Sequence, residues 1–178
     1  MIVPKSKPRQ PADVTQRILR AGGVPPGTVA LLGVRGYYRD TMGQPGKNDR
    51  GIYDDAIFLV SPSVHAAFNA NTDPSIFRPH IASLVPGLWQ YKIGTHGLSK
   101  PKALRYTALV QAAEVEVSRD QETAERGWFG INIHRGGRNG TSSLGCQTIH
   151  PDQWPAFIAL VQAELRRAGQ KAIPYLLT

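Results

Sequence analysis

Glycine and proline interrupt this chain at short intervals and limit the length of any regular element. There are 18 Gly and 14 Pro among 178 residues, and both residue types mark turns or end helices and strands. We therefore expect short elements joined by many turns. The chain is long enough for one well-buried core and short for two.

Runs of apolar and β-branched residues predict that most of the regular elements are strands. The expected strands cover residues 28–38, 53–62, 86–97, 107–120 and 127–137, with a closing strand at 172–177. Residues 62–75 are expected to mix a helical turn with loop. The strand at 127–137 alternates, so that Ile131 and Ile133 point to one side and Asn132 and His134 to the other.

Two helices are expected, one near each end of the chain. The first covers residues 13–23, with Asp13 as N-cap and glycine at its end. The second covers residues 151–168, because five large apolar residues recur there at helical spacing. These five are Trp154, Phe157, Ile158, Val161 and Leu165. We predict a mainly β or α+β fold, with a basic N-terminal arm at 1–12 and a single domain at 13–178.

The chain is strongly basic, with a formal net charge of +8 and a pI near 9.9. A basic surface attracts polyanions such as nucleic acid, anionic lipid or the bacterial cell wall. The N-terminus is basic but lacks the apolar stretch of a secretory signal, and no apolar run has the length of a membrane span. We expect synthesis in the cytoplasm without a signal peptide, and no transmembrane segment.

The single cysteine of the chain, Cys146, follows His134 by twelve residues. A lone cysteine excludes an intramolecular disulfide, but a nearby imidazole can take the proton of a thiol and make it a nucleophile. Gly145 removes a Cβ beside the thiol and permits an unusual backbone angle. Backbone N–H groups there are candidates for an oxyanion hole. The alternative is that Cys146 is a small buried apolar residue.

The segments INIHRGG (131–137) and TSSLGCQTI (141–149) together resemble the catalytic domain of L,D-transpeptidases. The matching residues are His134, Ser143, Gly145 and Cys146. The resemblance implies a β-sandwich with short flanking helices, Cys146 as the nucleophile and His134 as the base. It also implies that the backbone carbonyl of Arg135 orients the imidazole.

The sequence departs from the family pattern in two ways, both on the side that chooses the acyl acceptor. Leu144 stands where the family often has His, and Gln147 and Thr148 stand where an Arg often follows the cysteine. Together with a short basic chain, these differences favour hydrolysis over transpeptidation. We expect a cysteine peptidase that cuts peptidoglycan stem peptides, in the manner of a phage or prophage endolysin that reaches the cell wall after release. An L,D-transpeptidase that forms or exchanges cross-links is the alternative.

Several polar residues are candidates for binding the stem peptide. Arg138 and Arg135 flank the expected site and suit a carboxylate, whereas Asp55 suits the cationic end of a substrate. The remaining candidates are Ser143 and His96. We expect no cofactor and a monomer.

Two further interpretations use other chemistry. His96, His134, Cys146, His150 and Asp54 or Asp55 are all possible zinc ligands, but no HExxH or CxxC spacing is present. The charge would also suit a non-catalytic domain that binds the cell wall or nucleic acid. Nucleic acid is not the partner we expect, because the tryptophans are not interleaved with Lys and Arg.

Overall fold

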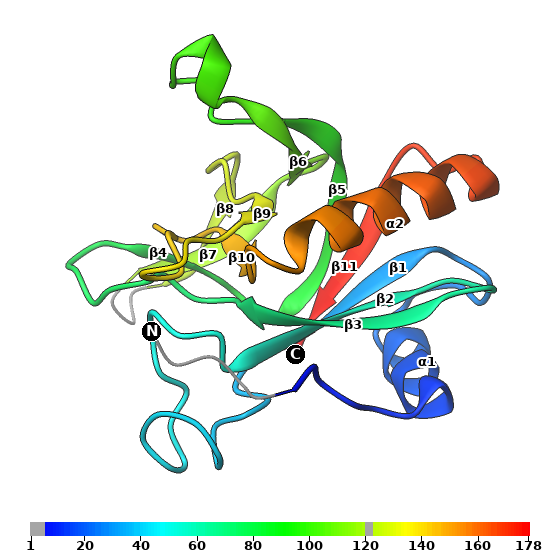
Figure 1. Cartoon of the computed structure of the whole chain (residues 1–178), viewed down its shortest axis with the longest axis horizontal. Helices are drawn as coiled ribbons and strands as arrows, with labels where there is room; N and C mark the ends of the chain where they lie inside the picture. Colours follow the sequence, from blue (N-terminus) through cyan, green and yellow to red (C-terminus); the bar gives the residue numbers. More distant parts are fainter. Residues whose placement is uncertain (1–5, 120–122) are drawn as a thin grey trace.

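The structure, a computed structural model, describes residues 6–119 and 123–178, which form a strand-rich fold with two α-helices (Figure 1). The elements in chain order are α1 (Ala12–Ala21), β1 (Ala30–Val34), β2 (Asp55–Val60), β3 (His65–Asn71), β4 (Ala82–Leu84), β5 (Gly87–His96), the 3-10 helix η1 (Lys102–Leu104), β6 (Tyr106–Gln111), β7 (Val115–Arg119), β8 (Glu125–Gly127), β9 (Ile133–Arg135), β10 (Gln147–Ile149), α2 (Trp154–Ala168) and β11 (Ile173–Leu177). The expectation of a mainly β chain with a helix near each end is confirmed.

Eight strands form a sheet that closes on itself, in the order β1-β11-β5-β6-β9-β10-β3-β2, and β4, β7 and β8 form a separate small sheet. Two of the pairs, β1 with β11 and β9 with β10, are parallel, and the others are antiparallel. The expected sandwich of two facing sheets is therefore replaced by one closed sheet. The β1–β11 pair joins the first and last strands of the chain, and alternation within a strand carries no information about so distant a partner.

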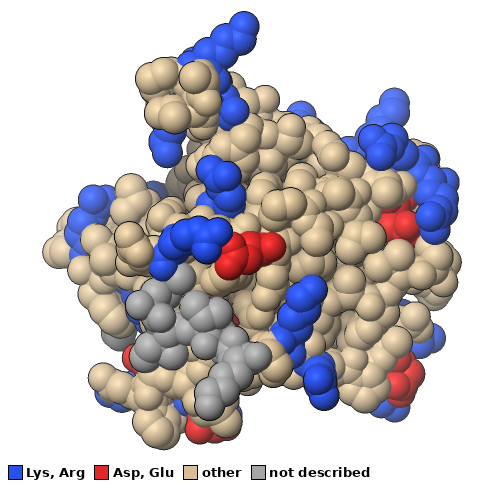
Figure 2. All heavy atoms as spheres, in the orientation of Figure 1, with Lys and Arg blue, Asp and Glu red and all other residues tan. Residues whose placement is uncertain are grey.

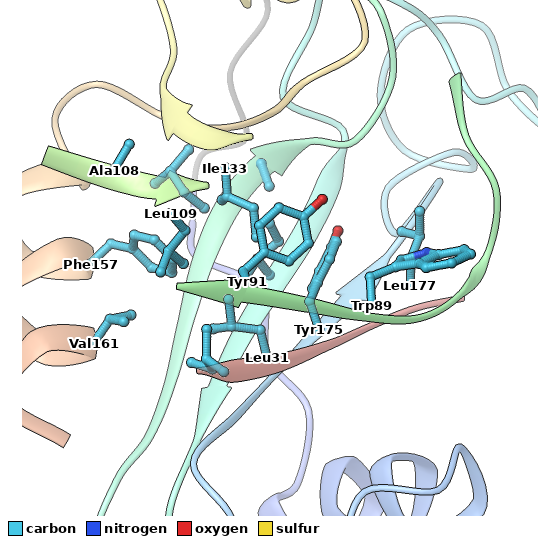
Figure 3. Close-up of a cluster of buried hydrophobic side chains, with 14 of the residues drawn as sticks. Leu31, Trp89, Tyr91, Ala108, Leu109, Ile133, Phe157, Val161, Tyr175 and Leu177 are labelled. Carbon is cyan, nitrogen blue, oxygen red and sulfur yellow. The ribbon is translucent and has the colours of Figure 1, made fainter. Parts of the chain in front are cut away.

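Helix α2 packs its apolar face against the sheet and completes the main core. Phe157, Val161 and Leu165 are buried at helical spacing, and Figure 3 shows Phe157 and Val161 pointing from α2 toward strand residues that include Leu109. The helix is followed by Gly169, whose φ of 64° is left-handed. The second predicted helix is confirmed, although it begins at Trp154 rather than at residue 151. Neither helix in the described part of the chain is long and apolar enough to cross a membrane.

The N-terminal segment is attached to the sheet rather than loose. The Ser6 carbonyl accepts hydrogen bonds from the Tyr38 hydroxyl at 3.1 Å and from Asn69 Nδ2 at 3.2 Å, so this end of the expected basic arm lies on the fold. Residues 1–5 of that arm lie outside the described residues. Helix α1 begins at Ala12, and Asp13 pairs with Arg17 at 3.3 Å within the first turns. Asp13 is therefore not the expected N-cap.

The segment at 62–75 differs most from expectation, because it contains strand β3 instead of a helical turn. Six consecutive pairs join β3 to β2, from Asp55 opposite Ala70 to Val60 opposite His65. Pairing with a neighbouring strand therefore overrides the weak local preference of this alanine-rich segment. The predicted strand at 107–120 is divided into β6 and β7, and only Ile133–Arg135 of the strand at 127–137 joins the closed sheet.

Candidate active site

The parallel pairing of β9 and β10 brings the cysteine segment beside the histidine strand. Thr148 lies opposite His134 and Gln147 opposite Ile133, so Cys146 is placed next to Asn132. The Asn132 N–H donates to Cys146 Sγ at 3.4 Å, and the thiol donates to the Gly130 carbonyl at the same distance. A twelve-residue gap in sequence thus becomes a contact between neighbouring chain segments.

The imidazole of His134 is buried, with 5% of its surface exposed, and is held by a backbone acceptor. Its Nδ1 lies 2.8 Å from the carbonyl oxygen of Arg135. A carbonyl only accepts hydrogen bonds, so Nδ1 carries the proton and Nε2 has a free lone pair. The Arg135 carbonyl therefore has the orienting position that the resemblance implied for it.

The His134 ring contacts His96 and Tyr106, and Asn132 contacts His96 in turn. The rings of His96 and His134 stack at a centroid distance of 4.0 Å, and the Tyr106 hydroxyl lies 3.3 Å from His134 Nδ1. Asn132 Nδ2 lies 3.2 Å from His96 Nδ1. His96 and Tyr106 are opposite each other at the end of the β5–β6 pair. The residues of this polar cluster therefore come from β5, β6, β9 and the segment just before β9.

Sequence reasoning did not single out Tyr106 or Asn132. The signal for Asn132 was present, because it alternates with His134 on one side of the same strand. Tyr106 carried no such signal, since it reaches His134 only through the pairing of β6 with both β5 and β9.

Burial keeps both candidate catalytic groups uncharged near neutral pH. Burial, together with the neighbouring His96, lowers the pKa of His134 to about 4. Burial also raises the pKa of the Cys146 thiol, opposed in part by the hydrogen bond from Asn132. The resting pair is thus a thiol and a neutral imidazole. No hydrogen bond joins them among the described residues, and catalytic hydrogen bonds are often long or misaligned before substrate binds.

The turn before Cys146 is shaped by Ser143 and Gly145. The Ser143 hydroxyl donates to the Cys146 carbonyl at 2.6 Å, and the N–H of Gly145 donates to Ser143 Oγ at 3.0 Å. The buried Ser143 side chain thus stabilises the turn from inside rather than facing a substrate. Because the Gly145 N–H is engaged, the oxyanion donor left at this turn is the N–H of Cys146, which bonds to no other described residue.

Gly145 is expected to tolerate no side chain. Its φ is +128°, and an added Cβ would lie 2.6 Å from the backbone oxygen of Ala82. We expect Gly145→Ala to destabilise the protein by about 1–3 kcal/mol through backbone strain and this clash. Chemical denaturation measures the loss. Gly140→Ala is the matched control in the same loop, because a Cβ there meets nothing within 4 Å; equal losses in both variants would contradict the prediction.

Asp55 is not available as the expected substrate ligand, whereas Arg138 stays a candidate. Asp55 is fully buried and accepts hydrogen bonds from the N–H groups of Gly36 and Thr72, both at 2.5 Å. Burial and the neighbouring Asp54 raise its pKa. The expected role of Asp55 is therefore wrong, because the start of β2 lies inside the protein. Arg138 is at the surface but is engaged in an ion pair with Asp152.

The zinc interpretation finds no ligand set in the described residues, where no three His, Cys, Asp or Glu side chains come together as metal ligands. The groups present are a tautomer-fixed imidazole on β9 and a lone thiol in the segment that leads into the paired strand β10. No protein-family model matches the chain, and neither the curated proteins nor the solved structures contain a match to it, so a functional assignment depends on the geometry of the cluster and on the sequence around it.

Proposed function

We propose that this chain is a peptidoglycan hydrolase that cuts stem peptides through the thiol of Cys146. The observation that carries the proposal is the state of His134. Its Nδ1 proton is fixed on the Arg135 carbonyl, and its strand pairs with the segment that follows Cys146. A buried imidazole with a free Nε2, on a strand paired with the segment that carries a lone thiol, suits nucleophilic catalysis.

The proposed reaction has two steps. As Sγ of Cys146 attacks a peptide carbonyl, Nε2 of His134 takes the thiol proton, and the N–H of Cys146 donates to the oxyanion. The C–N bond then breaks as His134 gives that proton to the leaving amine, which leaves a thioester. In the second step, water attacks the thioester while His134 accepts its proton. Return of the proton to sulfur releases a carboxylic acid and restores the thiol.

The residue after the nucleophile supports hydrolysis as the leading proposal. Gln147 is buried, its Oε1 accepts from the Tyr175 hydroxyl at 3.1 Å, and its Nε2 donates to the Gly145 carbonyl at 3.3 Å. It therefore offers no cation to the carboxylate of an incoming amine acceptor. The role of a phage or prophage endolysin belongs to the same proposal, since a chain with a net charge of +8 is attracted to the anionic wall. The likeness around His134 and Cys146 favours L,D-transpeptidation as the second candidate.

Labelled water separates the two candidates. Purified sacculi and defined muropeptides are incubated with the protein in water enriched in ¹⁸O, with and without a free D-amino acid, and the products are analysed by mass spectrometry. A hydrolase gives shortened or uncross-linked stems that carry one ¹⁸O in the new carboxyl group. A transpeptidase gives new cross-links or exchanged D-amino acids without that label. Binding to sacculi with no product of either kind would contradict both candidates.

A further inference from the structure

The connection between β5 and β6 forms an exposed apolar and basic protrusion. We call residues 98–105 the hairpin tip. Every residue of the hairpin tip is exposed, and Leu98 and Leu104 expose 68% and 59% of their surfaces. Figure 1 shows this green segment extending away from the body of the protein at the top of the view. Two large aliphatic side chains are thus presented to solvent on a projecting turn.

The hairpin tip is also basic and has no acidic neighbours in sequence. It carries Lys100, Lys102 and Arg105, none of which forms an ion pair with another described residue. No Asp or Glu occurs from residue 74 to residue 113. In Figure 2 the protrusion at the top shows blue Lys and Arg atoms beside tan atoms, without red. The cations of the hairpin tip are therefore free to meet an anionic surface.

The backbone of the hairpin tip has its own hydrogen bonds. The N–H of Lys100 donates to the Gly97 carbonyl at 2.8 Å, and that of Leu104 donates to the Pro101 carbonyl at 2.9 Å. The Arg105 side chain closes the turn by donating from Nε to the Lys100 carbonyl at 2.9 Å. These bonds lower the cost of moving the turn into a less polar environment, because an unpaired backbone group there is expensive.

We propose that the hairpin tip binds the surface of an anionic phospholipid bilayer, with Leu98 and Leu104 in the interfacial region and the three cations at the lipid phosphates. A soluble anionic polymer would neutralise the cations but would leave both leucines in water. A bilayer interface accommodates aliphatic side chains and basic side chains at the same time. The projecting shape of the hairpin tip also suits a flat surface rather than a cleft.

The hairpin tip is joined directly to the strand ends that carry the polar cluster around His134. His96 and Tyr106, which contact His134, are opposite each other just before and just after this connection. Membrane binding would thus hold the candidate active site close to the bilayer. This inference goes beyond the proposed function and does not depend on it, because lipid binding requires no chemistry at Cys146.

Vesicle flotation with the intact chain tests the proposal. We expect binding to vesicles of phosphatidylglycerol and phosphatidylcholine and little binding to phosphatidylcholine alone. The double variant Leu98→Ser/Leu104→Ser should bind the anionic vesicles at least about tenfold more weakly. Lys100→Gln and Lys102→Gln should each weaken binding about fivefold. Circular dichroism checks that each variant retains the fold.

Phe77→Ser is the matched control. Phe77 exposes 79% of its surface, and the Arg50 guanidinium lies over its ring at 4.3 Å, so this is another exposed apolar residue beside a cation, on a different loop. We expect it to bind vesicles as the unchanged protein does.

The proposal is overturned if Phe77→Ser loses as much binding as the leucine variant. It is also overturned if the leucine variant binds normally while a soluble polyanion removes the protein from vesicles, because charge alone would then explain the binding. None of these measurements uses peptidoglycan. A negative result for lipid binding would therefore not contradict the proposed hydrolase activity.

Discussion

Cys146→Ala is expected to lower the hydrolysis of purified sacculi by about 10³-fold or more, because the acyl-enzyme cannot form without the thiol. Among the described residues, the substitution removes one hydrogen bond that the thiol accepts and one that it donates, both at 3.4 Å. The fold should therefore survive it, with a melting temperature close to that of the unchanged protein. Release of labelled stem peptides measures the activity.

Alkylation supplies the control for this variant, because Cys146 is the only cysteine in the chain. Iodoacetamide should add one group to the unchanged protein and abolish its activity, at a rate that rises with pH as the thiol ionises. The alanine variant should take up no label. Hydrolysis at the normal rate by Cys146→Ala would exclude the thiol mechanism.

His134→Ala is expected to lower kcat/KM by about 10²–10⁴-fold, the usual contribution of a positioned acid or base. His65→Ala is the matched control. His65 lies on β3, where its Nε2 is 3.1 Å from Thr15 Oγ1, and we expect no comparable loss on its replacement. Similar losses in both variants would show that the effect is structural.

The pH dependence of kcat/KM of the unchanged protein should reflect the lowered pKa of His134. Burial lowers the pKa of His134 to about 4, so the imidazole stays neutral and able to accept a proton down to that pH. We expect kcat/KM to fall as the pH is lowered through about 4, rather than near the ordinary histidine value of about 6.5. An acid limb near 6.5 would mean that another group is the base or that His134 is more hydrated than it is in this structure.

The helices and strands with a strong apolar pattern were predicted correctly from the sequence. Helix α2 was predicted because its large apolar residues recur at helical spacing, and β2 because an apolar run is buried on both faces. Strand β3 was missed because HAAFNAN contains small and polar residues without alternation. Closure of the sheet was missed because a parallel partner is chosen by distant parts of the chain.

The same contrast holds for the candidate site, where local sequence could indicate some residues but not others. His134 and the unusual backbone angle of Gly145 could be expected from one short stretch of sequence, and the family resemblance implied the role of the Arg135 carbonyl. Tyr106 joins them only through sheet register, and no local pattern could indicate it. Asp55 was misjudged because a charged residue at the start of a strand usually faces water, whereas here the backbone N–H groups of Gly36 and Thr72 surround it.

The pairing of β1 with β11 has a consequence for biosynthesis. The Gly33 carbonyl accepts from the N–H of Thr178, and the two residues are 145 positions apart. At usual translation rates a ribosome needs roughly 7–30 s to make that length of chain. During this time one edge of β1 has no partner and can pair with other nascent chains. The closed sheet can therefore form only after β11 has left the exit tunnel.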